Sequence, residues 1–505
     1  MELRKYCTLL FFICLVLNVL FLSVGWDHTI LGSHACRQTQ NGITTYYMIK
    51  EGLRLDYYTP VAGKPWSIPL EFPFFQGITA VLVKSFGTPL EQTGRAVNAF
   101  FYYSSLLVLY ILLGYLGIEK TSRILFICLL LASPLYIFWS RSFMIETIAL
   151  FFSLCFLAAV LRFSIKRTYP SAVLAGFAGA CAGLSKISTF IVFLLPIGVV
   201  YVWFCHRVRK KVKKVRSLIG QTALIFGIPV LLSMAWMSFS LHTLARNPFS
   251  YLWLPVNGIG SLAQRLSLRE WLNVYTTLLC LLGDFSLPRA RYALLLFFVL
   301  FLIGFIASRR YRGFILVCIA CFLWGPLVFT QLYIVHSYYY YATGIFLLCA
   351  VGFLLIDLLV QEKYRFVTGF VILPALLLSM FGWYLKAFYP EQAVNDLSLV
   401  RIAEAVQHYT REEDIILCYN DGGSPQIPYY AKRKALIDPT LQPLHDSHMK
   451  RVLEALQGER PAAMVFETPL CKQEDFVQER LRYFGFPPQP VFHDENGDVY
   501  LRSQQ

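Results

Sequence analysis

Long apolar runs separated by short polar segments make up most of the first 387 residues. A helix needs roughly twenty apolar residues to cross a hydrocarbon core about 30 Å thick. The pattern therefore predicts a polytopic α-helical membrane protein with about eleven transmembrane helices, near 6–25, 97–117, 123–139, 145–162, 171–185, 187–205, 217–238, 292–308, 313–332, 341–360 and 366–387. The boundary inside 171–205 is the least regular, because "GLSKIS" breaks the apolar pattern either as a loop or as a re-entrant segment.

The pattern changes after residue 388. Helix-like "NDLSLVRIAEAVQHYT" is followed by strand-like "DIILCY", a second helical stretch near 446–457, and the strand-like "AAMVFE" and "DVYLR". This alternation is typical of a small α/β domain. We therefore predict a transmembrane domain at 1–387, which includes an external loop at 26–95, and a soluble domain at 388–505. A lid, a scaffold or a docking surface for an acceptor would all fit the soluble domain.

Composition supports the membrane assignment, with 57% hydrophobic and only 15% charged residues among 505. The formal net charge of +15 comes largely from short loops between apolar runs, so it indicates membrane topology and lipid contact rather than nucleic-acid binding. The basic segments are "MELRK", "RFSIKR", "HRVRKKVKKVR", "SRRYR" and "QEKYR". With eleven spans they all fall on one side, which the positive-inside rule identifies as the cytoplasm. We expect a bacterial inner membrane, with a cytoplasmic N-terminus and an extracytoplasmic C-terminal domain.

The external loop carries a dense polar cluster, "HACRQTQNGITTYYM", directly after the first span. An enzyme that works at the outer face must take its base from the few external carboxylates. Glu71 stands between Leu70 and Phe72 in a Pro-flanked apolar run, where burial would raise its pKa and favour a general base unless a cation or donor compensates. A solvated loop carboxylate is the plainer interpretation.

Further ionisable side chains lie at the external ends of predicted spans. Glu146 follows Arg141 by five residues, so it is either an interfacial partner of that arginine or part of a functional polar pathway. Lys186 interrupts an apolar helix, where its ammonium could hold a phosphate or extend to the interface. The tract "HSYYYY" supplies further hydrogen-bond donors or an aromatic belt through His336, Tyr338 and Tyr339.

These motifs, in this order, resemble the GT-C superfamily of membrane glycosyltransferases. The similarity is to the branch that groups protein O-mannosyltransferases with lipid A aminoarabinose transferases, and it runs from the first span to about residue 440. It is carried by "RQTQ" after span one, "EFPFFQ", "SRSFMIETIALFF", "LSKIST", "HSYYYY" and "YYAKRKAL".

The resemblance implies a hexosyl- or pentosyltransferase that moves a sugar from a polyprenyl-phosphate carrier to an acceptor hydroxyl, with inversion, at the extracytoplasmic face. It implies that Arg37, Gln38 and Gln40 bind sugar and phosphate, with Arg141, Lys186, His336, Tyr338 and Tyr339 as further binding residues. Many relatives carry an acidic residue where this chain has "RQTQ". The base must then come from elsewhere, with Glu71 first, then Asp56 and Asp27, and Glu146 matching an acid of a second loop.

Sugar and acceptor, whether a glycan, a lipid or a protein, stay open at this point. No cofactor is expected with certainty, although Glu71 and Glu146 could hold a divalent metal ion if they converge. A transporter or flippase of lipid-linked saccharides would explain the spans, and it predicts charges buried at mid-membrane. The spans are also compatible with a non-enzymatic scaffold and with a polysaccharide polymerase or ligase, although the latter would concentrate its polar residues in a late loop.

Overall fold

The computed structural model describes residues 3–208, 215–249, 258–283, 291–420, 422–438 and 446–502. Contacts between Cα atoms divide the chain into two compact units. The helical unit comprises Met1–Trp26, Asn98–Met234 and Asn257–Ala393, and the mixed unit comprises Asp27–Val97, Ala235–Val256 and Val394–Gln505. The first loop is thus grouped with the C-terminal part of the chain, whereas the domain boundary at 387 and 388 stays a prediction.

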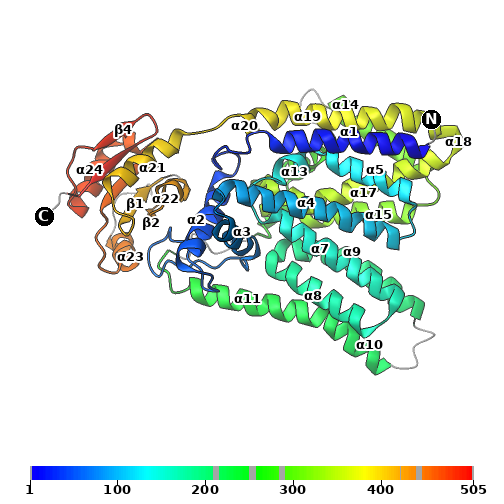
Figure 1. Cartoon of the computed structure of the whole chain (residues 1–505), viewed down its shortest axis with the longest axis horizontal. Coiled ribbons are helices and arrows are strands. Elements are labelled where there is room, and N and C mark those ends of the chain that lie inside the picture. The colour runs from blue at the N-terminus through cyan, green and yellow to red at the C-terminus, as the bar shows by residue number, and fades with distance from the viewer. Residues whose placement is uncertain are drawn as a thin grey trace. The chain divides into compact units, whose positions relative to one another are not determined.

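Within the described residues, seven helices are long and apolar enough to cross a membrane (Figure 1). They span Arg4–Ser23, Leu90–Tyr115, Glu146–Lys166, Ile187–His206, Leu218–Leu244, Ser337–Val360 and Glu362–Ala387. The four other predicted spans correspond to shorter helices, namely α5 (Lys120–Ala132) with α6 (Pro134–Trp139), α8 (Tyr169–Ser185), α14 (Arg291–Ala307) and α15 (Arg312–Val328). The chain is an integral membrane protein, and the count of eleven spans stays a prediction.

The run predicted as one span at 123–139 is two helices, because Pro134 follows a break at Ser133. Proline lacks the backbone N–H that a continuing helix needs, so it starts a new helix instead. Asn18 of α1 (Leu3–Ser23), which is fully buried, donates to the carbonyl of Leu131 at 2.8 Å. This side chain compensates one of the carbonyls that the break leaves open.

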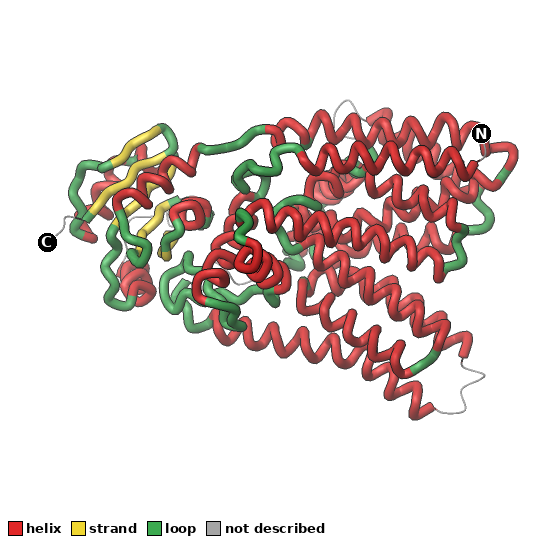
Figure 2. Tube along the Cα trace, viewed as in Figure 1, coloured by secondary structure: helices red, strands yellow, loops and turns green. Residues whose placement is uncertain are grey.

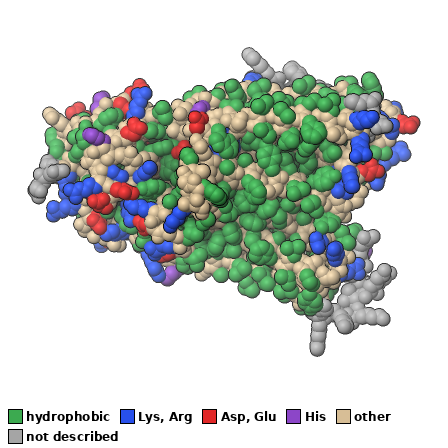
Figure 3. All heavy atoms as spheres, viewed as in Figure 1, with side chains coloured by type: hydrophobic (Ala, Val, Ile, Leu, Met, Phe, Trp, Pro, Cys, Tyr) green, Lys and Arg blue, Asp and Glu red, His purple; other side chains and the backbone are tan. Residues whose placement is uncertain are grey.

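Helix α17 (Tyr340–Val360) is the central element of the helical unit, since all but its last residue are buried. It packs against α5, α7 (Glu146–Lys166), α9 (Ile187–Val208) and α15. Hydrophobic side chains cover most of the visible face of this bundle, as expected of a surface in contact with lipid (Figure 3). Asp357, near the end of α17, accepts hydrogen bonds from the backbone N–H groups of Arg309 and Arg310, both at 2.9 Å.

The mixed unit contains a five-stranded sheet with the order β2-β1-β3-β5-β4 (Figure 2). Strands β1 (Ile415–Tyr419), β2 (Lys434–Asp438) and β3 (Ala463–Glu467) are parallel, whereas β4 (Phe492–Asp494) and β5 (Gly497–Leu501) continue the sheet antiparallel. The strands alternate with the helices α21 (Ser398–Tyr409), α22 (Gln426–Ala431), α23 (Asp446–Leu456) and α24 (Glu474–Phe484). The predicted alternation of strands and helices after residue 388 is confirmed, whereas a separate domain outside the membrane stays a prediction.

The first loop joins this sheet directly. Its segment 60–63 pairs antiparallel with β2: the carbonyl of Pro60 accepts from Ala435 N at 2.9 Å, and that of Val61 from Ile437 N at 2.9 Å. The pairing satisfies backbone groups on a strand that would otherwise be an open edge. The loop also contributes the helices α2 (Ala35–Glu51) and α3 (Phe74–Phe86), which pack on each other.

Candidate functional site

Helix α2 carries the polar cluster that follows the first span. Eleven of its seventeen residues are buried, although its composition is mostly polar, so it is held by specific contacts rather than by an apolar stripe. It lies against α22, and a Cβ added at Gly42 would come within 2.7 Å of the ring of Tyr429. Glycine at this position permits the close approach and fixes where the neighbouring polar side chains lie.

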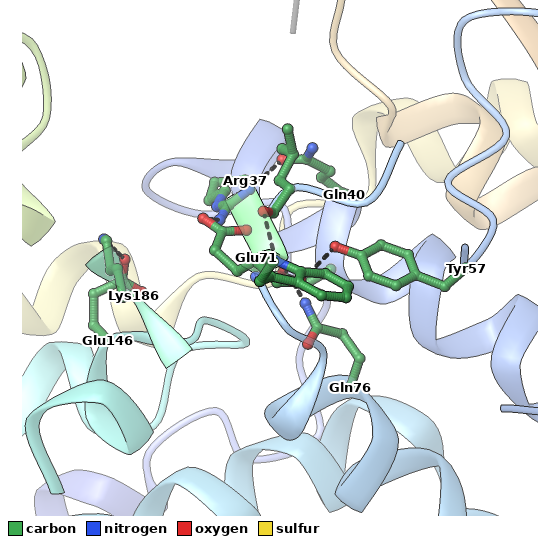
Figure 4. Close-up of polar contacts among 10 residues, drawn as sticks. Arg37, Gln40, Tyr57, Glu71, Gln76, Glu146 and Lys186 are labelled. Atoms are coloured by element: carbon green, nitrogen blue, oxygen red, sulfur yellow. Dashed lines mark hydrogen bonds and ion pairs between the residues drawn. The ribbon is translucent and has the colours of Figure 1, made fainter. Parts of the chain in front are cut away.

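Arg37 and Glu71 form an ion pair in the mixed unit (Figure 4). The guanidinium also donates from Nη1 to Gln40 Oε1 at 2.7 Å. The side chains of Arg37 and Glu71 are only 15% and 23% exposed, so solvent screens this pair less than a surface salt bridge. Three residues proposed from the sequence, Arg37, Gln40 and Glu71, are therefore together in one cluster.

Residues that the sequence pattern does not single out hold this cluster in place. The hydroxyl of Tyr57 donates to the backbone carbonyl of Glu71 at 2.8 Å, and Trp236 Nε1 donates to that of Leu70 at 3.2 Å. Gln76 Nε2 donates to Asn41 Oδ1 at 2.9 Å and joins α3 to α2. The tyrosine and tryptophan contacts fix the backbone on which the Glu71 carboxylate stands, a supporting role that no short motif reveals.

The other carboxylates proposed for the first loop lie in different surroundings. Asp56 is half-exposed and accepts from Arg54 Nη2 at 2.8 Å, and this hydrogen bond lowers the pKa of the aspartate. Asp27 is exposed. Gln38, proposed beside Arg37 and Gln40, is buried and donates to the carbonyl of Ser33 at 3.0 Å. Glu71 is thus the more enclosed of the three loop carboxylates proposed as bases.

A second ion pair lies inside the helical unit. Lys186 Nζ donates to Glu146 Oε1 at 2.5 Å, and both side chains are 5% exposed (Figure 4). Glu146 is the first residue of α7, and Lys186 is the single extended residue between α8 and α9. Arg141, which the sequence offered as a partner for Glu146, donates instead to the carbonyl of Gly25 at 2.5 Å.

Aromatic rings from the tyrosine tract lie around this pair. Lys186 Nζ is 3.9 Å from the ring centroid of Tyr339 and 5.0 Å from that of Tyr338. The ring of His336 stacks on Tyr338 at 5.1 Å. Glu146 uses one oxygen for the lysine, and its buried Oε2 has no hydrogen-bond partner among the described residues. Glu146, Lys186, His336, Tyr338 and Tyr339 thus form a second cluster.

Asn98 is a further residue that sequence reasoning missed. Its amide Nδ2 donates to the carbonyl of Met144 at 2.8 Å and also to that of Ser142. These bonds fix the turn that leads into α7 and so orient Glu146. The signal available in the sequence was an asparagine inside a predicted apolar span, and the structure buries it completely.

Neither carboxylate proposed as a metal ligand suits that role, since Glu71 is paired with Arg37 and Glu146 with Lys186. Across the parts of the chain that the structure describes, no group of three or more His, Cys, Asp or Glu side chains could hold a metal ion.

Comparison with known proteins supports the class suggested by the motifs. Residues 7–245, just under half of the chain, match the model of the dolichyl-phosphate-mannose-protein mannosyltransferase family. This stretch contains both ion pairs. No curated protein sequence matches the chain significantly.

Solved structures match over nearly the whole chain. ArnT of Cupriavidus metallidurans bound to undecaprenyl phosphate has a TM-score of 0.62 at 16% identity and covers 99% of both chains. The Archaeoglobus fulgidus oligosaccharyltransferase has a TM-score of 0.58 at 11% identity, over 95% of this chain and 71% of its own. The arabinofuranosyltransferase AftD from Mycobacteria has a TM-score of 0.53 at 14% identity, over 99% of this chain and 40% of its own.

The chain therefore has the fold of the GT-C glycosyltransferases, and the predicted resemblance to that superfamily is confirmed. At the level of class, the chain has a GT-C fold, and its N-terminal half matches the protein mannosyltransferase family.

Proposed function

We propose that the protein transfers a hexose or pentose from a polyprenyl-phosphate carrier to the hydroxyl of a glycan, lipid or protein acceptor. In this reaction the acceptor oxygen attacks the anomeric carbon, with inversion. The bond from that carbon to the carrier phosphate breaks, and the phosphate leaves with the lipid. A carboxylate accepts the hydroxyl proton. The donor class is supported by the similarity to ArnT, which was solved with undecaprenyl phosphate bound.

The Arg37–Glu71 ion pair is the observation that carries the proposal. Glu71 takes the role of base, because its enclosed carboxylate is held in place by Arg37 and is a group that can accept a proton. Arg37, with several N–H donors in a planar fork, suits an anionic oxygen as well as the glutamate. Gln40, already bonded to the guanidinium, keeps that fork oriented.

The Lys186–Glu146 pair takes a separate role, the binding of the carrier phosphate. The ammonium donates to Glu146, and the rings of Tyr338 and Tyr339 lie within 5.0 Å of it. A compact cation in a place shielded from solvent stabilises a developing phosphate charge strongly. Arg141 takes a structural role, because its guanidinium donates a hydrogen bond to the backbone carbonyl of Gly25.

The proposal includes a topology of eleven spans in a bacterial inner membrane, with the N-terminus cytoplasmic and the mixed unit extracytoplasmic. The clustering of Lys and Arg in alternate loops supports this orientation. A lipid-linked donor also requires its site to be at the edge of the bilayer, and this agrees with polar clusters near span ends.

The test uses the purified chain in liposomes with a panel of polyprenyl-phosphate sugars, and it measures release of the free lipid phosphate. Glu71→Gln is expected to lower the rate by about 10²–10⁴-fold, the usual contribution of a general base. Glu51→Gln is the matched control: Glu51 is 27% exposed and ion-paired with Lys434 at 3.1 Å in the same unit. Its rate is expected to equal that of the wild type.

Equal rates for Glu71→Gln and the wild type would overturn the base assignment. Movement of the intact donor across the bilayer without cleavage would support a flippase in place of a transferase. Transfer from a soluble nucleotide sugar without lipid would contradict the proposed donor.

A further inference from the structure

The parallel part of the sheet has a switch in its winding between β1 and β3. The chain leaves β1 through α22 to β2 on one side, and then passes through α23 to β3 on the other side of β1. In open α/β sheets, ligands bind outside the carboxyl ends of the strands at such a switch point. In this sheet that position is flanked by Asn420, after β1, and Glu467, the last residue of β3.

Asn420 organises this edge. Its fully buried amide donates to Glu467 Oε1 at 2.9 Å and to the carbonyl of Ser424 at 2.7 Å, and it accepts from Ser424 N at 3.0 Å. Gly422 and Gly423 both have positive φ, at 80° and 70°, and no atom of the described residues lies within 4 Å of a Cβ placed on either. The hydrogen bond from Asn420 orients the Glu467 carboxylate at this edge.

Glu467 differs from the carboxylates of the two ion pairs, because no Lys or Arg within the described ranges forms an ion pair with it. Among those residues, Asn420 is the one hydrogen-bond donor to its side chain, and the glutamate is half-buried. A carboxylate without a cation repels phosphate and accepts hydrogen bonds from neutral hydroxyl groups. Burial raises the pKa of Glu467 to about 7.

Helix α2 connects this edge to the Arg37–Glu71 pair. The Cys36 thiol lies next to Ser424, whose buried hydroxyl has no other hydrogen-bond partner in the described part of the chain. Burial raises the pKa of this thiol, and the charge of Glu467 raises it further. The next residue, Arg37, contacts Glu71. Cys36 and Arg37 are consecutive residues of α2, so this one helix contributes both to the sheet edge and to the ion pair.

We propose that the carboxyl edge between β1 and β3 binds the saccharide acceptor, whose hydroxyl groups donate hydrogen bonds to Glu467. This inference rests on the proposed transferase function and gives the C-terminal sheet an acceptor-binding role. The anionic donor is excluded from this edge by the carboxylate, which has no cation beside it in the described ranges. Asn420 is a positioning residue, because its amide groups are already engaged.

Cys36 is exposed and provides a reporter for the test. The full-length chain, with Cys471→Ser to remove a second accessible thiol outside the spans, is labelled with a membrane-impermeant maleimide. The probes are neutral methyl glycosides of hexoses and pentoses, with inorganic phosphate as the anionic comparison. At least one glycoside is expected to slow the labelling of Cys36, and phosphate is expected to have no effect.

Glu467→Gln preserves the side-chain shape and the oxygen that accepts from Asn420. Because hydrogen bonds to a charged group are among the stronger ones, half-maximal protection is expected to need about tenfold more glycoside in this variant. Glu404→Gln, an exposed carboxylate on α21, is the control and is expected to match the wild type. Transfer to a protecting glycoside is expected to show a KM raised by about tenfold in Glu467→Gln, with a smaller change in kcat.

Absence of protection by every glycoside, or equal protection in the wild type and Glu467→Gln, would overturn the inference. The donor-cleavage assay separates this failure from that of the transferase proposal. Donor cleavage without Glu467-dependent protection of Cys36 would contradict the acceptor-site proposal alone. Glu467-dependent protection of Cys36 without donor cleavage would support the saccharide site and contradict the transferase assignment.

Discussion

The Lys186–Glu146 pair offers a sharp energetic test, because both side chains are almost completely buried. Removing one partner of such a pair leaves an uncompensated charge and costs roughly 3–5 kcal/mol. The two single variants should differ. Lys186→Met leaves a buried carboxylate whose second oxygen already lacks a hydrogen-bond partner among the described residues, so the full penalty is expected.

Glu146→Gln leaves the ammonium over the Tyr339 ring at 3.9 Å. A desolvated cation–π contact contributes about 2 kcal/mol. The free energy of unfolding is therefore expected to fall by about 2 kcal/mol less in Glu146→Gln than in Lys186→Met. The double variant Glu146→Gln/Lys186→Met buries no charge and is expected to be more stable than Lys186→Met alone.

The assay is the free energy of unfolding of the purified chain in lipid bicelles, measured for the wild type, both single variants and the double variant. Lys166→Met, which removes an exposed lysine from the end of α7, is the control and is expected to change stability by less than about 0.5 kcal/mol. The reasoning would be refuted if Lys186→Met behaved like this control, or if the effects of the two single variants simply added in the double variant.

Two further predictions concern the carboxylates of the mixed unit. Asp56→Asn is expected to keep the wild-type rate of donor cleavage and to lower stability by less than about 1 kcal/mol, because Asp56 forms an exposed salt bridge with Arg54. A large loss of rate in that variant would move the base from Glu71 to Asp56. Glu467 has a folded-state pKa raised to about 7 from an ordinary 4.5, so its protonated form is favoured by folding. The stability that it contributes is present below about pH 4.5 and is lost as the pH rises to about 7. The melting temperature of the wild type, compared with that of Glu467→Gln, is therefore expected to fall across this interval, and parallel pH profiles would contradict the assignment.

The amino-acid sequence predicts the helices and strands of this protein better than the contacts between their side chains. Apolar run lengths locate the helices of the bundle, and the alternating pattern after residue 388 predicts the α/β fold. The prediction of one continuous helix at 123–139 was wrong, because Pro134 divides it into two helices. Pro134 is visible in the sequence, but a prediction from run length and hydropathy alone ignores that proline lacks the backbone N–H of a continuing helix.

The partners of the charged side chains in the site cannot be predicted from their distance along the sequence. Arg141 is close to Glu146 along the chain, yet Lys186, forty residues away, is its partner. The reason is that Lys186 occupies the break between two helices that both pack against α7. Arg37 and Glu71 were both proposed from sequence, but their ion pair depends on the packing of α2 against the following loop.

The buried charges of the helical unit also bear on the choice between transferase and transporter. A transporter is expected to keep charges at mid-membrane that change partners as its substrate moves. Within the described residues, the buried charged groups of this unit have fixed local partners. Asp357 accepts from backbone N–H groups at the start of α15, Glu146 holds Lys186, and Arg141 holds a backbone carbonyl. Local partners of this kind orient each charge in advance, and a site that stabilises a transition state requires such preorganised groups.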